Sequence, residues 1–213
     1  MSVRRLPVYI LLDTSGSMRG EPIHSVNVGL QAMLSALRQD PYALESVHLC
    51  IITFDNGARE YLPLTALDEV QIGEIEVPQS GATFLGAALE LLIERVDRDV
   101  RKSTDEAKGD WRPLLFVMTD GSPSDLMAYR QAIPKVKARH FASIVVCAAG
   151  HKAKLDVLHE LTDRLVRLDT MDASAFAGFF KWVSASVAVG SSSAGLEPEV
   201  TLPPPPPEVQ LVF

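Results

Sequence analysis

Four continuous apolar runs constrain the fold more than any other feature of this 213-residue chain. They are rich in strand-forming residues and cover residues 8–12, 47–54, 114–119 and 143–149. Runs of this kind are typical of strands that are buried on both faces of a parallel sheet. Segments with apolar residues at helical spacing separate the runs, so the order of elements predicts a mainly parallel α/β sheet with helices on both faces.

Shorter patterns complete the predicted order of elements. Asp55, Asn56 and Gly57 supply the residues of a tight hairpin turn, which should return residues 59–64 as one antiparallel edge strand. A short last strand is expected at residues 165–168. Helices are expected over residues 21–37, where Glu21 and Pro22 open the helix, and over residues 85–96 and 152–162. Further helices are expected after Pro123, with a break or kink at Pro134, and after Asp172.

Composition restricts the class of protein. The hydrophobic content of 47% suffices for one α/β domain with a large core. The net charge of −7, without a cluster of Lys and Arg, argues against nucleic-acid binding. We see neither a signal peptide nor a membrane span, and Cys50 and Cys147 lie in apolar runs, as reduced core cysteines would. We therefore expect a cytoplasmic protein that binds neither membranes nor nucleic acid.

The composition changes after Gly190. Residues 1–189 are expected to form the folded domain, and residues 190–213 a flexible tail rich in Gly, Ser and Pro. Five successive prolines, residues 203–207, favour an extended polyproline conformation and cannot complete a sheet ladder. Residues 209–213 are apolar enough to dock, either on a partner or on the domain's own edge.

Side chains that carry oxygen follow two of the apolar runs. Asp13, Ser15 and Ser17 occupy alternate positions after the first run, a pattern that alone would also fit a turn capping the next helix. Asp120 follows the third run, and Thr83 lies in the loop before the helix at residues 85–96. Ligands of parallel sheets bind outside the carboxyl ends of the strands. If the first and third strands are neighbours, these side chains meet in one crevice.

The residue types predict the ligand of this crevice. Carboxylate and hydroxyl oxygens suit Mg²⁺, Mn²⁺ or Ca²⁺ better than zinc. Because three separate loops supply only oxygen donors, we predict a divalent metal site. We expect Mg²⁺, with Mn²⁺ or Ca²⁺ as alternatives, at Asp13, Ser15, Ser17, Thr83 and Asp120.

The combination of D-x-S-x-S, a lone threonine and T-D-G after an apolar strand resembles the metal-ion-dependent adhesion site of von Willebrand factor A domains. The resemblance covers about residues 5–187 and implies the Rossmann-like fold of that family, with the hairpin strand at the antiparallel edge. It implies that Ser15 and Ser17 bind the metal directly, and Thr83 directly or through water. It also implies that Asp13 and Asp120 hold metal-bound waters or enter the first coordination shell.

Four phrases resemble a narrower group, the TerY-like proteins of bacterial tellurite-resistance and stress-response clusters. They occur at residues 4–9, 39–45, 108–114 and 179–186. Proteins of that group are associated with a protein kinase and a metal-dependent Ser/Thr phosphatase. The resemblance therefore implies partners linked to phosphorylation.

A metal site of this kind fits two functions. In an interaction module, a metal held largely by neutral hydroxyls accepts an acidic oxygen from a protein partner. In the alternative, a metal-dependent hydrolase of phosphoesters, the site needs a positioned base. The three metal loops contain no histidine, and Asp163 stands where a zincin beginning at His159 would need one. We therefore favour a protein–protein interaction module that is not an enzyme.

Overall fold

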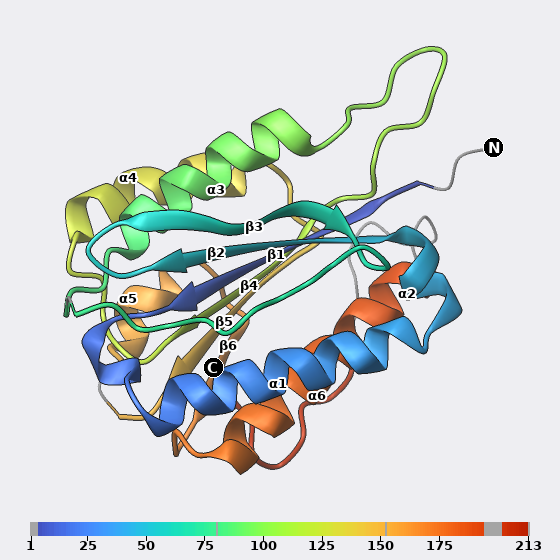
Figure 1. The fold of residues 1–213 in the computed structure, drawn as a ribbon. Coiled ribbons are helices and arrows are strands. Elements are labelled where there is room, and N and C mark those ends of the chain that lie inside the picture. Colours follow the sequence, from blue (N-terminus) through green and yellow to red (C-terminus); the bar gives the residue numbers. More distant parts are fainter. Residues whose placement is uncertain (1–3, 80, 152, 194–201, 213) are drawn as a thin grey trace.

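The computed structural model describes residues 4–79, 81–151, 153–193 and 202–212, and Figure 1 shows their arrangement. These residues form one seven-stranded sheet with the strand order β3-β2-β1-β4-β5-β6-β7. Strands β1, β2, β4, β5 and β6 are mutually parallel, and β3 and β7 are antiparallel at the two edges. The sheet was expected to have one antiparallel edge strand; it has two. The strands are β1 (Leu6–Asp13), β2 (Val47–Phe54), β3 (Ala58–Ala66), β4 (Leu114–Thr119), β5 (Ser143–Ala149), β6 (Leu165–Leu168) and β7 (Gln210–Val212).

Helices cover both faces of the sheet, as predicted (Figure 1). One face packs against α1 (Glu21–Arg38), α2 (Pro41–Ser46) and α6 (Ala173–Ser193). The other packs against α3 (Leu85–Asp99), α4 (Leu126–Lys137) and the short α5 (Leu155–His159). A 3₁₀ turn, η1 (Gly16–Met18), leads from β1 towards α1.

The central strand β1 shows why its sequence is continuously apolar. All eight of its residues are buried. Val8, Ile10 and Leu12 enter the core beneath α1 and α6. Tyr9 and Leu11 enter the core beneath α3 and α4. Each face therefore requires apolar side chains at alternate positions, and together the two faces require the uninterrupted run.

Three helices differ from the sequence-based expectation. Helix α4 is not broken at Pro134 but continues to Lys137. Pro134 and Arg130 are both exposed, so water can bond the Arg130 carbonyl group that the proline leaves without a donor. The helix expected over residues 152–162 is only α5. Helix α2 was not expected; Asp40 caps it by accepting hydrogen bonds from the backbone N–H groups of Tyr42 and Ala43.

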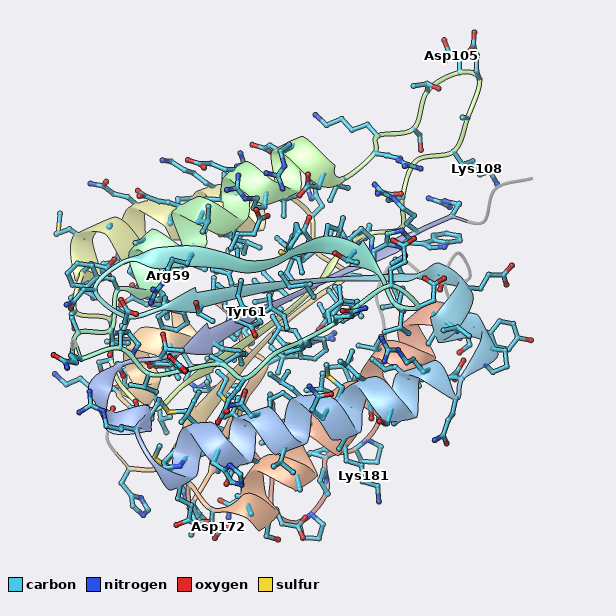
Figure 2. The ribbon with its side chains drawn as sticks, viewed as in Figure 1. Arg59, Tyr61, Asp105, Lys108, Asp172 and Lys181 are labelled. Carbon is cyan, nitrogen blue, oxygen red and sulfur yellow. The ribbon has the colours of Figure 1, made fainter. Side chains whose placement is uncertain are left out.

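The last helix, α6, begins where the sequence indicated. Asp172 Oδ1 accepts a hydrogen bond from Ala175 N at 3.0 Å, and Figure 2 shows this residue at the start of the helix. By length and composition alone α6 could cross a membrane. Its Phe176 and Phe180 are nevertheless buried in the core beneath the sheet, so its apolar composition is that of a core helix. The two cysteines are free and buried, as expected.

The end of the chain differs from the flexible tail that was expected from residue 190. Helix α6 extends to Ser193, and residues 202–212, which we call the strap, lie against the domain. The prolines indeed form no ladder, but the residues that follow them pair with β6 as β7. The strap therefore docks on the domain's own edge. Residues 194–201 and 213 of the expected tail lie outside the described residues.

Candidate metal centre

The predicted site residues lie at the carboxyl end of the sheet. Strands β1 and β4 are neighbours, with Leu12 paired to Met118, so Asp13, the last residue of β1, and Asp120, the residue after β4, lie at the same end of adjacent strands. In Figure 1 the loops after β1 and β4 and the loop before α3 gather at this end of the sheet. The charged loop from residue 100 to 113 projects from the domain elsewhere, with Asp105 and Lys108 on its outer part (Figure 2).

Asp13 is held in one orientation. Its side chain is only 1% exposed. Oδ1 accepts a hydrogen bond from the backbone N–H of Ser15 at 2.8 Å, and Oδ2 accepts one from Thr119 Oγ1 at 2.6 Å. Thr119 in turn accepts a hydrogen bond from Gly121 N at 3.2 Å, so its hydroxyl joins the ends of β1 and β4. Each carboxylate oxygen retains a free lone pair for a further donor or cation.

The electrostatics of Asp13 favour a nearby cation. Burial raises the pKa of its carboxyl group to about 6, and the neighbouring carboxylate of Asp120 contributes in the same direction. Hydrogen bonds from Ser15 and Thr119 oppose this increase. The negative charge of Asp13 is therefore energetically costly in the metal-free domain.

Asp120 is the most informative residue of the site. It is 2% exposed, and within the described part of the chain neither of its carboxylate oxygens has a hydrogen-bond partner. A buried carboxylate without a partner costs free energy, because it has lost its contact with water. A hydrated divalent cation would supply the positive charge and the donors that Asp120 lacks. The surroundings of the Asp120 carboxylate therefore fit a metal ion that it would hold through bound water molecules.

The two serines place their hydroxyl groups side by side. Ser15 Oγ and Ser17 Oγ are 3.3 Å apart across the η1 turn. Adjacent ligands of an octahedral Mg²⁺ ion are separated by about 3 Å, because each lies at about 2.1 Å from the metal. Ser15 is buried, whereas Ser17 is exposed at the rim of the site. The turn therefore presents two neutral oxygen donors at a spacing close to that of metal ligands.

Thr83 is positioned by the loop that follows β4. Its backbone N–H donates to Ser124 Oγ at 3.1 Å, and Ser124 N donates to Thr83 O at 2.8 Å. A Cβ atom added to Gly121 would lie 3.3 Å from Thr83 Oγ1, so the threonine hydroxyl lies beside the residue that follows Asp120. The third loop is thereby fixed next to the second.

Asp125 also connects the loop after β4 to the start of α3, next to Thr83. Its carboxylate accepts hydrogen bonds from Gly86 N at 3.0 Å and Ala87 N at 2.8 Å, in the first turn of α3. Its position before α4 is typical of a residue that caps its own helix, but its side chain makes no such bond and caps α3 instead. Sequence reasoning missed this role, as it missed those of Thr119 and Ser124.

The structure thus gathers the five predicted residues around one point. Ser15 and Ser17 are in contact, Asp13 is bonded to the Ser15 backbone and electrostatically coupled to Asp120, and Thr83 lies beside Gly121. The donors are two carboxylates and three hydroxyls, a set suited to a hard divalent cation. In the described ranges, no group of three or more His, Cys, Asp or Glu residues could hold a metal. The role of the five predicted residues as metal ligands remains a prediction.

The chain belongs to the von Willebrand factor type A domain family, whose model matches residues 8–172. Domains of this family can bind a metal at a metal-ion-dependent adhesion site and mediate protein interactions, and they are generally not enzymes.

Solved structures support the same fold. The chain is similar to proximal thread matrix protein 1 from the mussel byssus with a zinc-occupied metal-ion-dependent adhesion site (TM-score 0.63, 14% identity, covering 87% of this chain and 48% of that one). It is similar to a von Willebrand factor type A protein from Catenulispora acidiphila (TM-score 0.63, 14% identity, covering 88% of this chain and 43% of that one). It is also similar to the pilus adhesin SpaC from Lactobacillus rhamnosus GG in its open conformation (TM-score 0.70, 11% identity, covering 89% of this chain and 31% of that one). The chain spans less than half the length of each of these three proteins. No curated protein matches it.

Proposed function

We propose that this chain is a metal-dependent protein–protein interaction module that binds Mg²⁺ through Asp13, Ser15, Ser17, Thr83 and Asp120. The buried, unpartnered carboxylate of Asp120 beside Asp13 carries the proposal. Two neighbouring buried carboxylates are unfavourable without a cation, whereas a bound cation stabilises both.

The residues divide into two roles. The hydroxyls of Ser15, Ser17 and Thr83 would contact the ion, and the carboxylates of Asp13 and Asp120 would hold its waters. The ion would supply a Lewis-acidic position that accepts an acidic oxygen from a protein partner. Because hydroxyl ligands bring no formal charge, the site keeps its attraction for this further anionic group.

The charges of Asp13 and Asp120 make binding of the partner depend on the metal. Without a cation, Asp13 and Asp120 give the crevice a negative potential that repels a partner carboxylate. With the cation present, the local potential is reversed. Met127, in the first turn of α4 and 71% exposed, offers an apolar contact close in sequence to the loop that holds Thr83. A partner would therefore combine an acidic residue with an apolar neighbour.

We propose Mg²⁺ as the bound ion because all the donors are hard oxygens. Mn²⁺ and Ca²⁺ share this preference, and the mussel byssus protein holds zinc in its adhesion site. A competition series that measures each ion's affinity would establish the order. Occupancy by zinc rather than Mg²⁺ when each ion is supplied at its own cellular free concentration would contradict our choice.

The biological setting is a further part of the proposal. The four phrases that resemble TerY-like proteins support a cytoplasmic role in bacterial tellurite resistance or stress signalling. They also support a protein kinase and a metal-dependent Ser/Thr phosphatase as partners. The alternative, hydrolysis of phosphoesters, would be favoured by robust turnover that Asp13→Ala abolishes.

The experiment is a pull-down with the purified kinase and phosphatase candidates, in Mg²⁺ and in EDTA at constant ionic strength. Specific binding should disappear in EDTA and in Thr83→Val, which keeps the shape of the side chain and removes its hydroxyl. Glu94→Gln, on the exposed side of α3, is the control and should leave binding unchanged. Partners that remain bound in EDTA and to the folded Thr83→Val variant would contradict docking through the metal.

A further inference from the structure

The strap follows a defined path over the domain. Trp182 Nε1 on α6 donates a hydrogen bond to Pro203 O at 2.8 Å. Nearer the start of α6, Gly178 lies against Glu208: a Cβ atom added to the glycine would be 3.3 Å from Cβ of Glu208. The strap therefore runs antiparallel to α6, as the red segment in Figure 1 shows, and then joins β6 as β7.

The proline stretch has one face towards the domain. Pro204 and Pro207 are exposed, whereas Pro203, Pro205 and Pro206 are partly buried. Exposure that repeats after three residues fits a polyproline II segment, which has three residues per turn. Prolines have no N–H group, so the segment offers carbonyl oxygens, and the indole of Trp182 provides a matching donor.

A turn and a short strand follow the prolines. Val209 N donates to Pro206 O at 2.9 Å, which closes the turn. The side chain of Val209 is 2% exposed and lies in the core cluster that also contains Trp182. Leu211 and Val212 then pair with β6 opposite Val166 and Leu165.

Gln210 adds a specific polar contact. Its Nε2 donates to Asp169 Oδ2 at 2.6 Å, and its Oε1 accepts from Arg167 Nη2 at 3.3 Å. Both hydrogen-bonding groups of the amide are thus matched by one acceptor and one donor. Asp169 and Arg167 also form an ion pair at 2.8 Å, which fixes the contact.

We propose that this surface, formed by Arg167, Asp169, Gly178, Trp182 and the edge of β6, is a binding site for extended proline-containing peptides, and that the strap is its resident ligand. It combines two modes by which domains bind peptides, an aromatic donor against a polyproline segment and addition of a strand to a sheet edge. A partner segment with prolines, a turn, a buried aliphatic residue and a following Gln exchanges with the strap. This site lies at the far edge of the sheet from β3 and uses none of the proposed metal ligands.

The first test measures peptide binding to the full chain carrying Val209→Asp, which places a charge at the buried anchor and releases the strap. A fluorescent peptide of residues 202–212 should bind this variant with a Kd of about 100 µM or tighter. It should bind the natural chain at least about tenfold more weakly, because the strap occupies the site in most molecules.

Two altered peptides control for specificity. Val209→Asp in the peptide should weaken binding to the released chain by about tenfold or more, since Val209 is the buried anchor. Leu211→Asp in the peptide should have little effect, because Leu211 is 46% exposed. Equal effects of the two substitutions, or no binding of the natural peptide to the folded released chain, would overturn the proposal.

Hydrogen exchange on the natural chain decides the case if Val209→Asp prevents folding. The β7 amides and the Trp182 indole N–H should exchange by local opening, at least about a hundredfold faster than the amides of β1. The unlabelled peptide, added in excess, should slow the exchange of the indole. If the β7 amides exchange only by global unfolding, at the rate of the β1 amides, the strap is a permanent part of the fold. That result would refute its replacement by a partner peptide.

Discussion

Asp120→Asn should stabilise the metal-free domain. Both oxygens of Asp120 are buried without a partner within the described residues, and Asp13 places a second carboxylate beside it. An asparagine of nearly the same shape removes the charge and the repulsion but keeps the packing. The asparagine amide is itself a buried polar group without a partner, so its own cost of about 1–3 kcal/mol remains, and only the additional cost of the charge is removed. The free energy of unfolding in EDTA should therefore rise by at least about 1 kcal/mol.

Mg²⁺ should reverse the order of stability of the natural protein and Asp120→Asn. A ligand that binds only the folded protein adds about 2.7 kcal/mol at a concentration of 100 times its Kd. The natural protein should gain this amount as Mg²⁺ is raised, whereas Asp120→Asn should gain much less because it holds the ion poorly. The variant is thus more stable in EDTA and less stable in saturating Mg²⁺.

Thermal unfolding followed by circular dichroism measures both effects. In a domain of this size, 1 kcal/mol corresponds to a shift of about 2–4 °C in Tm. Glu94→Gln makes the same chemical change on an exposed side of α3 and should shift Tm little in either buffer. A lower Tm for Asp120→Asn in EDTA, or an equal gain from Mg²⁺ in both proteins, would refute the role of Asp120.

Three further predictions follow from other contacts. In EDTA, raising the pH from 4 to 6 should destabilise the fold by about 2 kcal/mol. The folded pKa of Asp13, about 6, lies above its unfolded value, so the proton that stabilises the fold is lost in this range. Urea unfolding at each pH measures this, and pH-independent stability would contradict it. Asp125→Ala should cost about 1–2 kcal/mol and weaken Mg²⁺ binding, since it removes the cap of α3 and loosens the loop that carries Thr83; chemical denaturation and calorimetry that detect no change would refute this coupling. A chain ending at Ser193 should lose at least about 2 kcal/mol with the burial of Val209, and an unchanged Tm would instead support a passive tail.

The strands, and the position of the candidate site residues at one edge of the sheet, could be predicted from sequence because each depends on a local signal. The continuous apolar run of β1 follows from burial on both faces, and the acids that end β1 and β4 lie at the same edge in any sheet where those strands are neighbours. The chemistry of Asp13, Ser15 and Ser17 is the basis for predicting a divalent metal there, and that ligand stays a prediction.

The missed features depend on contacts between distant segments. Asp125 could cap either α3 or α4, and its local sequence favours the wrong helix. Thr119 ends an apolar run, so its hydroxyl has no visible purpose until β1 lies beside it. The prolines of the strap predict a flexible tail because they cannot join a sheet ladder, but a proline carbonyl group and the residues after the prolines make the contacts.

Calorimetric titration with Mg²⁺ tests the central claim most directly. The natural protein should bind a single ion, while Asp13→Ala and the double variant Ser15→Ala/Ser17→Ala should bind none and keep their circular dichroism spectra, because the altered side chains lie at or beyond the strand ends. Thr83→Val should weaken binding without abolishing the fold. Undiminished Mg²⁺ affinity in folded Asp13→Ala would show that these residues do not form the metal site.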